Sequence, residues 1–232
     1  MRIGIIGAMS EEIGPVIRQL HDPRHLIISG MTFVSGQLGN HSAVAVCSGI
    51  GKINAAVCTQ ILMSQFAITH GVFTGVAGGI APGFDIGDII LGEDIIQYDM
   101  DVTALGYELG FVPRLGIRSL PGDPALIESA LRIGESDPHR FGKVVRGRIL
   151  TGDSFIASHE RGRGLYEGLG GLCVDMEGAA IAQACYLAQI PSLVIRSLSD
   201  KADAQANLDY KACIRLAANR AADLTCAFLS TL

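Results

Sequence analysis

The cysteines of this sequence include no CxxC pair, although six are present. They stand among apolar residues, which indicates reduced thiols in the core of a cytoplasmic protein rather than disulfides or a zinc site. Charged residues are scarce at 18%, whereas hydrophobic residues make up 49%, so the composition argues against a disordered chain. The net charge of −5 provides no broad positive field, and we expect no nucleic-acid partner.

A long hydrophobic span is also missing. The stretch between Lys52 and Asp85 contains no Lys, Arg, Asp or Glu, which raises the question of a membrane helix. Polar or helix-breaking residues interrupt it, among them Gln65, His70 and Pro82, so that no unbroken run of 18 apolar residues remains. The apolar run at the N-terminus is too short for a secretory signal. We therefore expect no membrane partner.

The sequence does contain an alternation of buried strands and helices. Apolar runs predict strands over residues 2–7, 29–38, 41–50, 71–80, 88–96, 146–152 and 192–199. Helices are predicted over residues 10–20, 52–66, 123–135, 178–188 and 208–230. This alternation favours an α/β fold in a single domain over residues 1–232, with three layers around a mixed, mostly parallel sheet. In such sheets, ligands bind beyond the carboxyl ends of the strands.

Three acids follow apolar strand segments and have no evident ion-pair partner close by in the sequence: Glu12, Glu177 and Asp200. Cleavage of the glycosidic bond of a nucleoside needs such a set. One acid protonates the leaving base, one carboxylate activates water, and one holds the sugar hydroxyls. Helix N-termini also attract acids, so the spacing alone leaves a solvated helix start open as the alternative.

Patterns for cofactors and metals are weak. The segment GIIGAM at 4–9 contains GxxG rather than GxGxxG, so we do not expect a dinucleotide. His21 and His25 have the spacing of a metal pair, but without an HExxH pattern two exposed loop histidines are the better interpretation. The glycine-rich segments at 48–52 and 75–79 indicate tight turns when they are taken alone. We expect neither a cofactor nor a metal.

Seven segments taken together resemble one family: GIIGAMSEE, SGIGKINAA, TGVAGG, DVTALGYELG, TGDSFI, VDMEGAAIA and RSLSDKAD. They extend over nearly the whole chain in the order and with the spacing of the bacterial 5′-methylthioadenosine/S-adenosylhomocysteine nucleosidases, a branch of the nucleoside phosphorylase superfamily. The resemblance implies an αβα sandwich with a central mixed sheet, assembled as a homodimer. It also implies cofactor-free hydrolysis of an N-glycosidic bond that releases adenine.

The resemblance also assigns roles to matching positions. Asp200, oriented by Ser199, is implied to protonate N7 of adenine, and Glu12 is implied to activate the attacking water with the help of Arg196. Glu177 is implied to bind the ribose hydroxyls. Further implied contacts with the nucleoside come from Met176, Phe155, Ile156, Met9, Ile50, Val76, Ala77, Gly78 and Tyr210, and, across the dimer, from Val102, Leu105 and Pro113.

The residues also discriminate between water and phosphate as the attacking group. The resemblance implies that the phosphorylases of the superfamily carry an arginine and a hydroxyl residue at the positions that Phe73 and Val76 occupy here. A phosphate dianion needs charge-assisted donors, which an apolar pair does not supply. The sequence therefore favours hydrolysis. A nucleoside-binding protein without turnover is the alternative, and the water-activating acid Glu12 speaks against it.

Four positions depart from residues that are common in the family: Val76, Asp175, Leu105 and Tyr210. They leave the choice open among methylthioadenosine, S-adenosylhomocysteine, 5′-deoxyadenosine and aminodeoxyfutalosine as substrates. Asp175 precedes Glu177 by two residues. We expect Asp175 to point the other way by strand alternation and to support the loop rather than to touch the substrate.

Overall fold

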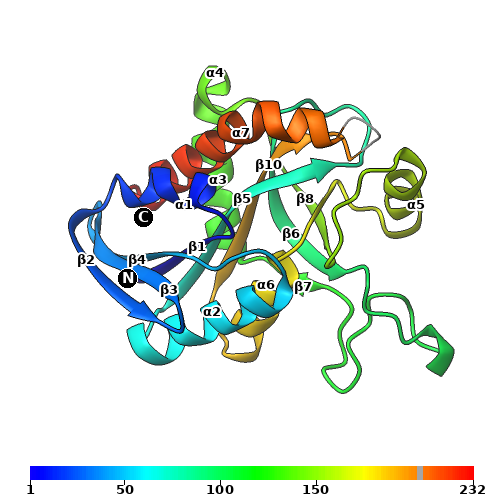
Figure 1. Cartoon of the computed structure of the whole chain (residues 1–232), viewed down its shortest axis with the longest axis horizontal. Coiled ribbons are helices and arrows are strands. Elements are labelled where there is room, and N and C mark those ends of the chain that lie inside the picture. The colour runs from blue at the N-terminus through cyan, green and yellow to red at the C-terminus, as the bar shows by residue number, and fades with distance from the viewer. Residues whose placement is uncertain (203–205) are drawn as a thin grey trace.

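Ten strands form one sheet at the centre of the molecule, which the computed structural model describes over residues 1–202 and 206–232 (Figure 1). The strands are β1 (Arg2–Gly7), β2 (His21–Ile28), β3 (Met31–Leu38), β4 (His41–Cys47), β5 (His70–Gly79), β6 (Ile89–Gln97), β7 (Leu120–Pro121), β8 (Val144–Thr151), β9 (Cys173–Asp175) and β10 (Ser192–Asp200). Their order is β10-β6-β8-β9-β5-β1-β4-β3-β2, with β7 beside β6 and a further pairing between β5 and β10.

The predicted mixed sheet is confirmed, but it is not mostly parallel. Among the described strands, the parallel pairings are β1–β4, β1–β5, β5–β10, β6–β8 and β8–β9. The antiparallel pairings are equally numerous: β2–β3, β3–β4, β5–β9, β6–β7 and β6–β10. Short connections make neighbouring strands antiparallel, as the two-residue turn at Gly39 and Asn40 does between β3 and β4.

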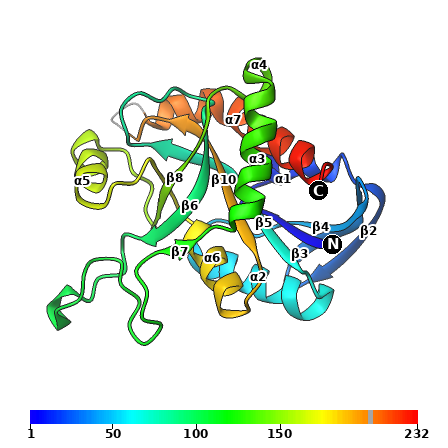
Figure 2. The same cartoon turned by 180° about the vertical axis from the view of Figure 1, so that it is seen from behind.

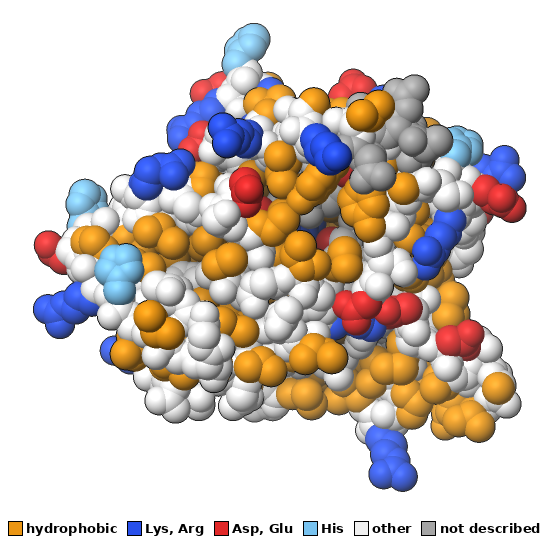
Figure 3. Space-filling view, viewed as in Figure 1, with side chains coloured by type: hydrophobic (Ala, Val, Ile, Leu, Met, Phe, Trp, Pro, Cys, Tyr) orange, Lys and Arg blue, Asp and Glu red, His pale blue; other side chains and the backbone are white. Residues whose placement is uncertain are grey.

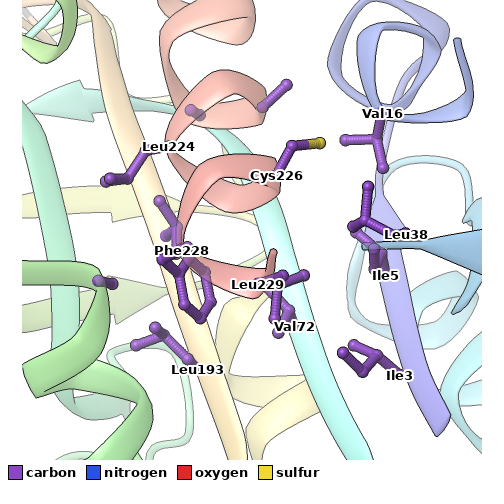
Figure 4. Packing of buried hydrophobic residues seen from close by; sticks show 14 of the residues in the cluster. Ile3, Ile5, Val16, Leu38, Val72, Leu193, Leu224, Cys226, Phe228 and Leu229 are labelled. Carbon is purple, nitrogen blue, oxygen red and sulfur yellow. The ribbon is translucent and has the colours of Figure 1, made fainter. Parts of the chain in front are cut away.

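Helices cover both faces of the sheet. They are α1 (Ser10–Ile17), α2 (Lys52–Phe66), α3 (Pro124–Ser136), α4 (Pro138–Phe141), α5 (His159–Leu169), α6 (Gly178–Leu187) and α7 (Ala206–Leu229), with the short 3-10 helix η1 (Thr103–Leu105). Side chains of α1, α3 and α7 share one buried apolar cluster with β1, β5 and β10 (Figure 4), and α2 and α6 share a second cluster. Figure 2 shows α3 beside α7, and α6 beside α2.

The strand residues alternate between these two clusters. Val72 and Leu193 belong to the first cluster, whereas their neighbours Phe73 and Val194 belong to the second. Because both faces of the central strands are covered, these strands are apolar along their length, and this explains why they are readily predicted.

Two elements longer than four residues were not predicted, β2 and α5. The strand β2 pairs with β3 at the edge of the sheet, and its residues are almost all exposed, so it carries no apolar alternation. His21 and His25 are exposed, as expected, but they lie in this strand and not in a loop. The helix α5 contains three glycines among its eleven residues and has few buried side chains, which masks its periodicity.

The predicted helices and strands otherwise agree with the structure to within a few residues at their ends. The largest difference at a helix end is in α1, which stops at Ile17 instead of continuing to residue 20, because the chain tightens into a turn there. Among the described residues, no helix is both long and apolar enough to cross a membrane.

Candidate active site

A pocket of about 380 Å³ opens where the carboxyl ends of β1, β5, β9 and β10 meet. We call it the central pocket. Figure 3 shows a hollow in the same face, with an acidic side chain visible inside it. The pocket is lined by thirteen residues that the sequence analysis singled out as site residues: Met9, Glu12, Ile50, Val76, Ala77, Gly78, Phe155, Ile156, Met176, Glu177, Ser199, Asp200 and Tyr210.

The remaining site residues lie elsewhere. Arg196 is completely buried behind the pocket. The residues implied to act across a dimer, Val102, Leu105 and Pro113, do not line it. Five lining residues were not among the predicted site residues: Ala8, Ser154, Val174, Asp175 and Lys211. Ala8, Ser154, Val174 and Asp175 lie within the quoted family segments, so only Lys211 had no signal in the sequence beyond its position after Tyr210.

Arg196 holds three carboxylates together beneath the pocket. Its Nε and Nη2 atoms each lie 2.7 Å from Asp175 Oδ2, Nη2 lies 3.3 Å from Glu177 Oε2, and Nη1 lies 3.8 Å from Glu12 Oε1. The guanidinium carbon stands 3.6 Å from the centre of the Phe73 ring. Burial by itself lowers the pKa of Arg196, but the three carboxylates outweigh it, so that the pKa is raised and the charge is retained.

Glu12 is fixed by three backbone amides as well as by Arg196. Its Oε2 accepts hydrogen bonds from the N–H groups of Ala8 at 2.6 Å and Met9 at 3.0 Å, and its Oε1 accepts one from Val76 at 2.8 Å. A side chain at Gly75 would overlap the carboxylate of Glu12, so this approach requires glycine. Burial raises the pKa of Glu12, and Arg196 and the amides oppose this shift.

Glu177 stands at the first position before α6 and faces the loop before α2. Its Oε1 accepts a hydrogen bond from the N–H of Gly51 at 2.8 Å. Gly51 has φ 98°, a conformation that glycine adopts readily, and this turns its N–H toward the carboxylate. Burial raises the pKa of Glu177 to about 7, although Arg196 opposes the shift. The N–H of Gly51 also opposes the shift, so both fixed donors favour the charged form of Glu177.

The expectation that Asp175 points away from Glu177 is wrong. Residues two apart in a strand share a face, and both carboxylates reach Arg196 although β9 ends at Asp175 and the chain then turns into α6. Asp175 Oδ1 accepts a hydrogen bond from Thr151 Oγ1 at 2.5 Å, and Oδ2 accepts one from the N–H of Gly178 at 3.0 Å. Asp175 lines the pocket, but its oxygens are engaged by the protein.

Asp200 lies at the end of β10 on another side of the central pocket and is 2% exposed. The Ser199 hydroxyl donates to Asp200 Oδ2 at 2.8 Å, and the N–H of Ala202 donates to Oδ1 at 2.9 Å. The same Ser199 oxygen lies 3.4 Å from the carbonyl oxygen of Ala77. When Asp200 carries a proton, the Ser199 hydroxyl can therefore donate to the carbonyl oxygen of Ala77 and accept a hydrogen bond from Asp200.

The outer end of the pocket is apolar and partly open. The Tyr210 hydroxyl lies 3.0 Å from the sulfur of Met9, and the Tyr210 ring meets Phe155 edge-on with 5.8 Å between the ring centres. Phe155 and Ile50 are 46% and 53% exposed. Burial raises the pKa of Tyr210 to about 12, so its hydroxyl is neutral at ordinary pH. This end can bind an uncharged, flat or aliphatic group.

The segment at 98–119 extends away from the sheet and contains η1 (green in Figure 1). It contains Val102, Leu105 and Pro113, and Leu105 is 73% exposed. Within residues 1–202 and 206–232, no three His, Cys, Asp or Glu side chains form a group that could hold a metal ion.

The geometry can be compared with known proteins. The family profile of the phosphorylase superfamily matches residues 2–230. A 5′-methylthioadenosine/S-adenosylhomocysteine nucleosidase from Shewanella denitrificans is 39% identical over 237 residues, which cover 100% of both chains. The crystal structure of such a nucleosidase from Colwellia psychrerythraea, in complex with adenine, has a TM-score of 0.95 at 36% identity and covers 100% of this chain and 96% of that one. The futalosine hydrolase of Helicobacter pylori has a TM-score of 0.95 at 29% identity, with 100% and 98% covered.

Proposed function

The chain belongs to the phosphorylase superfamily and, within it, to the 5′-methylthioadenosine/S-adenosylhomocysteine nucleosidases, and from this premise we propose that its central pocket hydrolyses the N-glycosidic bond of these nucleosides. The products are adenine and a ribose that carries the thio substituent at its 5 position. The observation that carries the proposal is the convergence of Glu12, Glu177 and Asp200 on one pocket in a chain that matches these enzymes over its full length.

Asp200 acts on the leaving group. It donates its proton to N7 of adenine, so that the electron pair of the C1′–N9 bond passes into a neutral base while the sugar becomes an oxocarbenium ion. Its contact with Ser199 supports this role, because the hydroxyl can accept from the protonated acid and donate to the carboxylate. Asp200 regains its proton from solvent after adenine leaves.

Glu12 acts on water. It takes one proton from a water molecule, whose oxygen forms the new bond to C1′ of the ribose. Burial raises the pKa of Glu12 and makes it a stronger base than an exposed carboxylate. Its three amide donors and Arg196 hold the oxygens in place, so that little reorganisation is needed during the reaction.

The other pocket residues bind the nucleoside. Glu177 accepts hydrogen bonds from the ribose hydroxyls, and Met176 packs against the sugar. Phe155 stacks on adenine, and the backbone of Ile156 contacts the edge of the base. The remaining contacts complete the 5′ and sugar sides of the pocket and come from Met9, Ile50, Val76, Ala77, Gly78 and Tyr210.

Water and not phosphate is the attacking group. A phosphate dianion in the pocket would meet the apolar side chain of Val76 and the carboxylate of Glu12. Arg196 is the buried cation close by, but its guanidinium is already engaged by three carboxylates and lies against the ring of Phe73. Among the described lining residues, Lys211 is the only lysine or arginine, and it is exposed, so the buried part of the pocket supplies no lining cation for a phosphate and hydrolysis is favoured.

The assembly is a homodimer in which the segment at 98–119 reaches the pocket of the partner, where Val102, Leu105 and Pro113 cover the 5′ substituent. Large exposed apolar side chains support this, since Leu105 is 73% and Ile53 is 79% exposed.

One three-layer αβα domain spans residues 1–232. All six cysteines are free, which supports a cytoplasmic location.

The test is to incubate the purified protein with each nucleoside in phosphate-free buffer and to follow free adenine by chromatography. We expect adenine from methylthioadenosine and S-adenosylhomocysteine without added phosphate. The Glu12→Gln variant serves as the matched inactive control. Adenine that appears only after phosphate is added would replace hydrolysis by phosphorolysis. Binding of a nucleoside without any adenine release would favour the binding-protein alternative.

A further inference from the structure

The charges that line the central pocket are uneven. Four carboxylates line it, those of Glu12, Asp175, Glu177 and Asp200. Among the described lining residues, Lys211 is the only lysine or arginine. A substrate with a negative group is therefore disfavoured everywhere in this pocket except near Lys211.

Lys211 stands at the outer end of the pocket. It follows Tyr210 on α7 and is exposed, whereas the four carboxylates are buried. Figure 3 shows Lys or Arg side chains over α7, at the edge of the hollow. Met9, Ile50 and Tyr210 line the pocket together with Lys211, so a 5′ substituent bound against these apolar side chains would have a cationic lining residue available.

The ammonium group of Lys211 is available for a ligand. It forms no ion pair or side-chain hydrogen bond with another described residue. Arg215, one helical turn further along α7, differs in this respect, because its charge interacts with Glu11 of α1 and helps to lower the pKa of that acid after the backbone and Ser10 contacts. A free lysine at the mouth of an acidic pocket is suited to a carboxylate.

We propose that Lys211 binds a carboxylate at the far end of the 5′ substituent and so raises the preference of this chain for carboxylate-bearing nucleosides over methylthioadenosine. The inference rests on the proposed function and names a specificity residue of the same pocket. The carboxylate has two possible sources. S-adenosylhomocysteine carries an amino-acid carboxylate, and aminodeoxyfutalosine carries a benzoate. Methylthioadenosine and 5′-deoxyadenosine have neutral 5′ groups and serve as references.

The experiment compares kcat/KM for the four nucleosides in the wild type and in Lys211→Met, Lys211→Arg and Arg132→Met. Met keeps the length of the side chain and removes the charge, and Arg restores the charge. Arg132 is an exposed arginine on α3 that does not line the pocket, so its variant controls for the change in net charge.

We expect Lys211→Met to lower the ratio of kcat/KM for a carboxylate nucleoside to that for methylthioadenosine by roughly two- to fivefold, the range of a solvent-exposed charge pair. Lys211→Arg should restore most of the ratio. Raising the salt concentration should lower the ratio in the wild type and leave it unchanged in Lys211→Met, since salt screens exposed charges. The nucleoside whose ratio responds identifies the source of the carboxylate.

The inference is overturned if the ratio for both carboxylate nucleosides is the same in Lys211→Met and in the wild type, or if Arg132→Met lowers it equally. It is also overturned if the wild type cleaves methylthioadenosine but neither carboxylate nucleoside. The first two failures leave the proposed function in place, and the third removes S-adenosylhomocysteine from its substrates while phosphate-independent cleavage of methylthioadenosine remains. The proposed function fails separately, through the absence of phosphate-independent adenine release from any of the four nucleosides.

Discussion

The two ends of the central pocket are built differently. At the inner end, Arg196 and Glu12 are buried, and each carboxylate oxygen of Glu12, Asp175 and Glu177 has at least one donor within the protein. At the outer end, Ile50 and Phe155 are about half exposed, and Tyr210 is held by one sulfur contact and one aromatic contact. The inner end is therefore rigid, and the outer end can vary at little cost.

This difference separates the reaction from the choice of substrate. A change at the inner end leaves a buried charge or amide without its partner, which costs several kcal/mol. A change at the outer end exchanges one partly exposed apolar contact for another. Two of the departures from common family residues fit this difference between the ends. Tyr210 lies at the variable outer end, and Asp175 at the inner end keeps the carboxylate charge that pairs with Arg196.

The largest effect should come from Asp200→Asn. The variant cannot donate a proton to N7, so kcat should fall by roughly 10²–10⁴-fold. Binding of methylthioadenosine should persist, because the shape of the side chain is kept. Adenine release and calorimetric titration measure the two quantities, with Asp85→Asn as an exposed control outside the pocket. Turnover close to that of the wild type would remove Asp200 from the role of acid.

Arg196→Met tests the rigidity of the inner end. It leaves Asp175, Glu177 and Glu12 without their shared cation, so we expect the free energy of unfolding to fall by about 3–5 kcal/mol. Arg163→Met is the matched control, because Arg163 and its partner Glu167 are 63% and 65% exposed and their pair contributes about 1 kcal/mol or less. Urea unfolding measures both. Equal losses in the two variants would contradict the contrast.

Phe155→Ala tests the outer end. Loss of the stacking surface should weaken nucleoside binding by about 1–3 kcal/mol, mainly as a higher KM. The free energy of unfolding should change little, because Phe155 is 46% exposed. Steady-state kinetics and thermal unfolding of the same preparation measure the two effects. A large fall in kcat with an unchanged KM would show that Phe155 acts on the reaction and not on binding.

The smallest effect concerns pH. The pKa of Glu177 is raised to about 7 by burial, so between its unfolded pKa near 4.5 and about 7 the folded protein binds more protons than the unfolded chain. The contribution of Glu177 to the free energy of unfolding is fully present below pH 4.5 and is lost as the pH rises through 7. The melting temperature of the wild type relative to Glu177→Gln should therefore fall between pH 5 and pH 8. Glu167 is an exposed acid on α5. If the melting temperature of the wild type relative to Glu167→Gln falls by the same amount over this pH range, the pH dependence does not come from Glu177.

Much of the fold was predictable for a physical reason. Strands covered on both faces, such as β1 and β5, are apolar along their length, and α2 begins and ends where it was predicted. The edge strand β2 and the glycine-containing helix α5 escaped prediction, because neither buries a regular apolar stripe. The balance of parallel and antiparallel pairings was also beyond reach, since it depends on which strands become neighbours.

The sequence by itself determined which residue types are available and where they stand along the chain, including Glu12, Glu177 and Asp200 after strand segments. Only the tertiary structure decided that Asp175 turns toward Arg196, that this arginine holds three carboxylates, and that Lys211 lies at the mouth of an acidic pocket. Local periodicity depends on burial within one element, and the sequence records it directly. Contacts between β9, β10 and α7 depend on how distant elements pack, and the spacing along the chain does not contain that information.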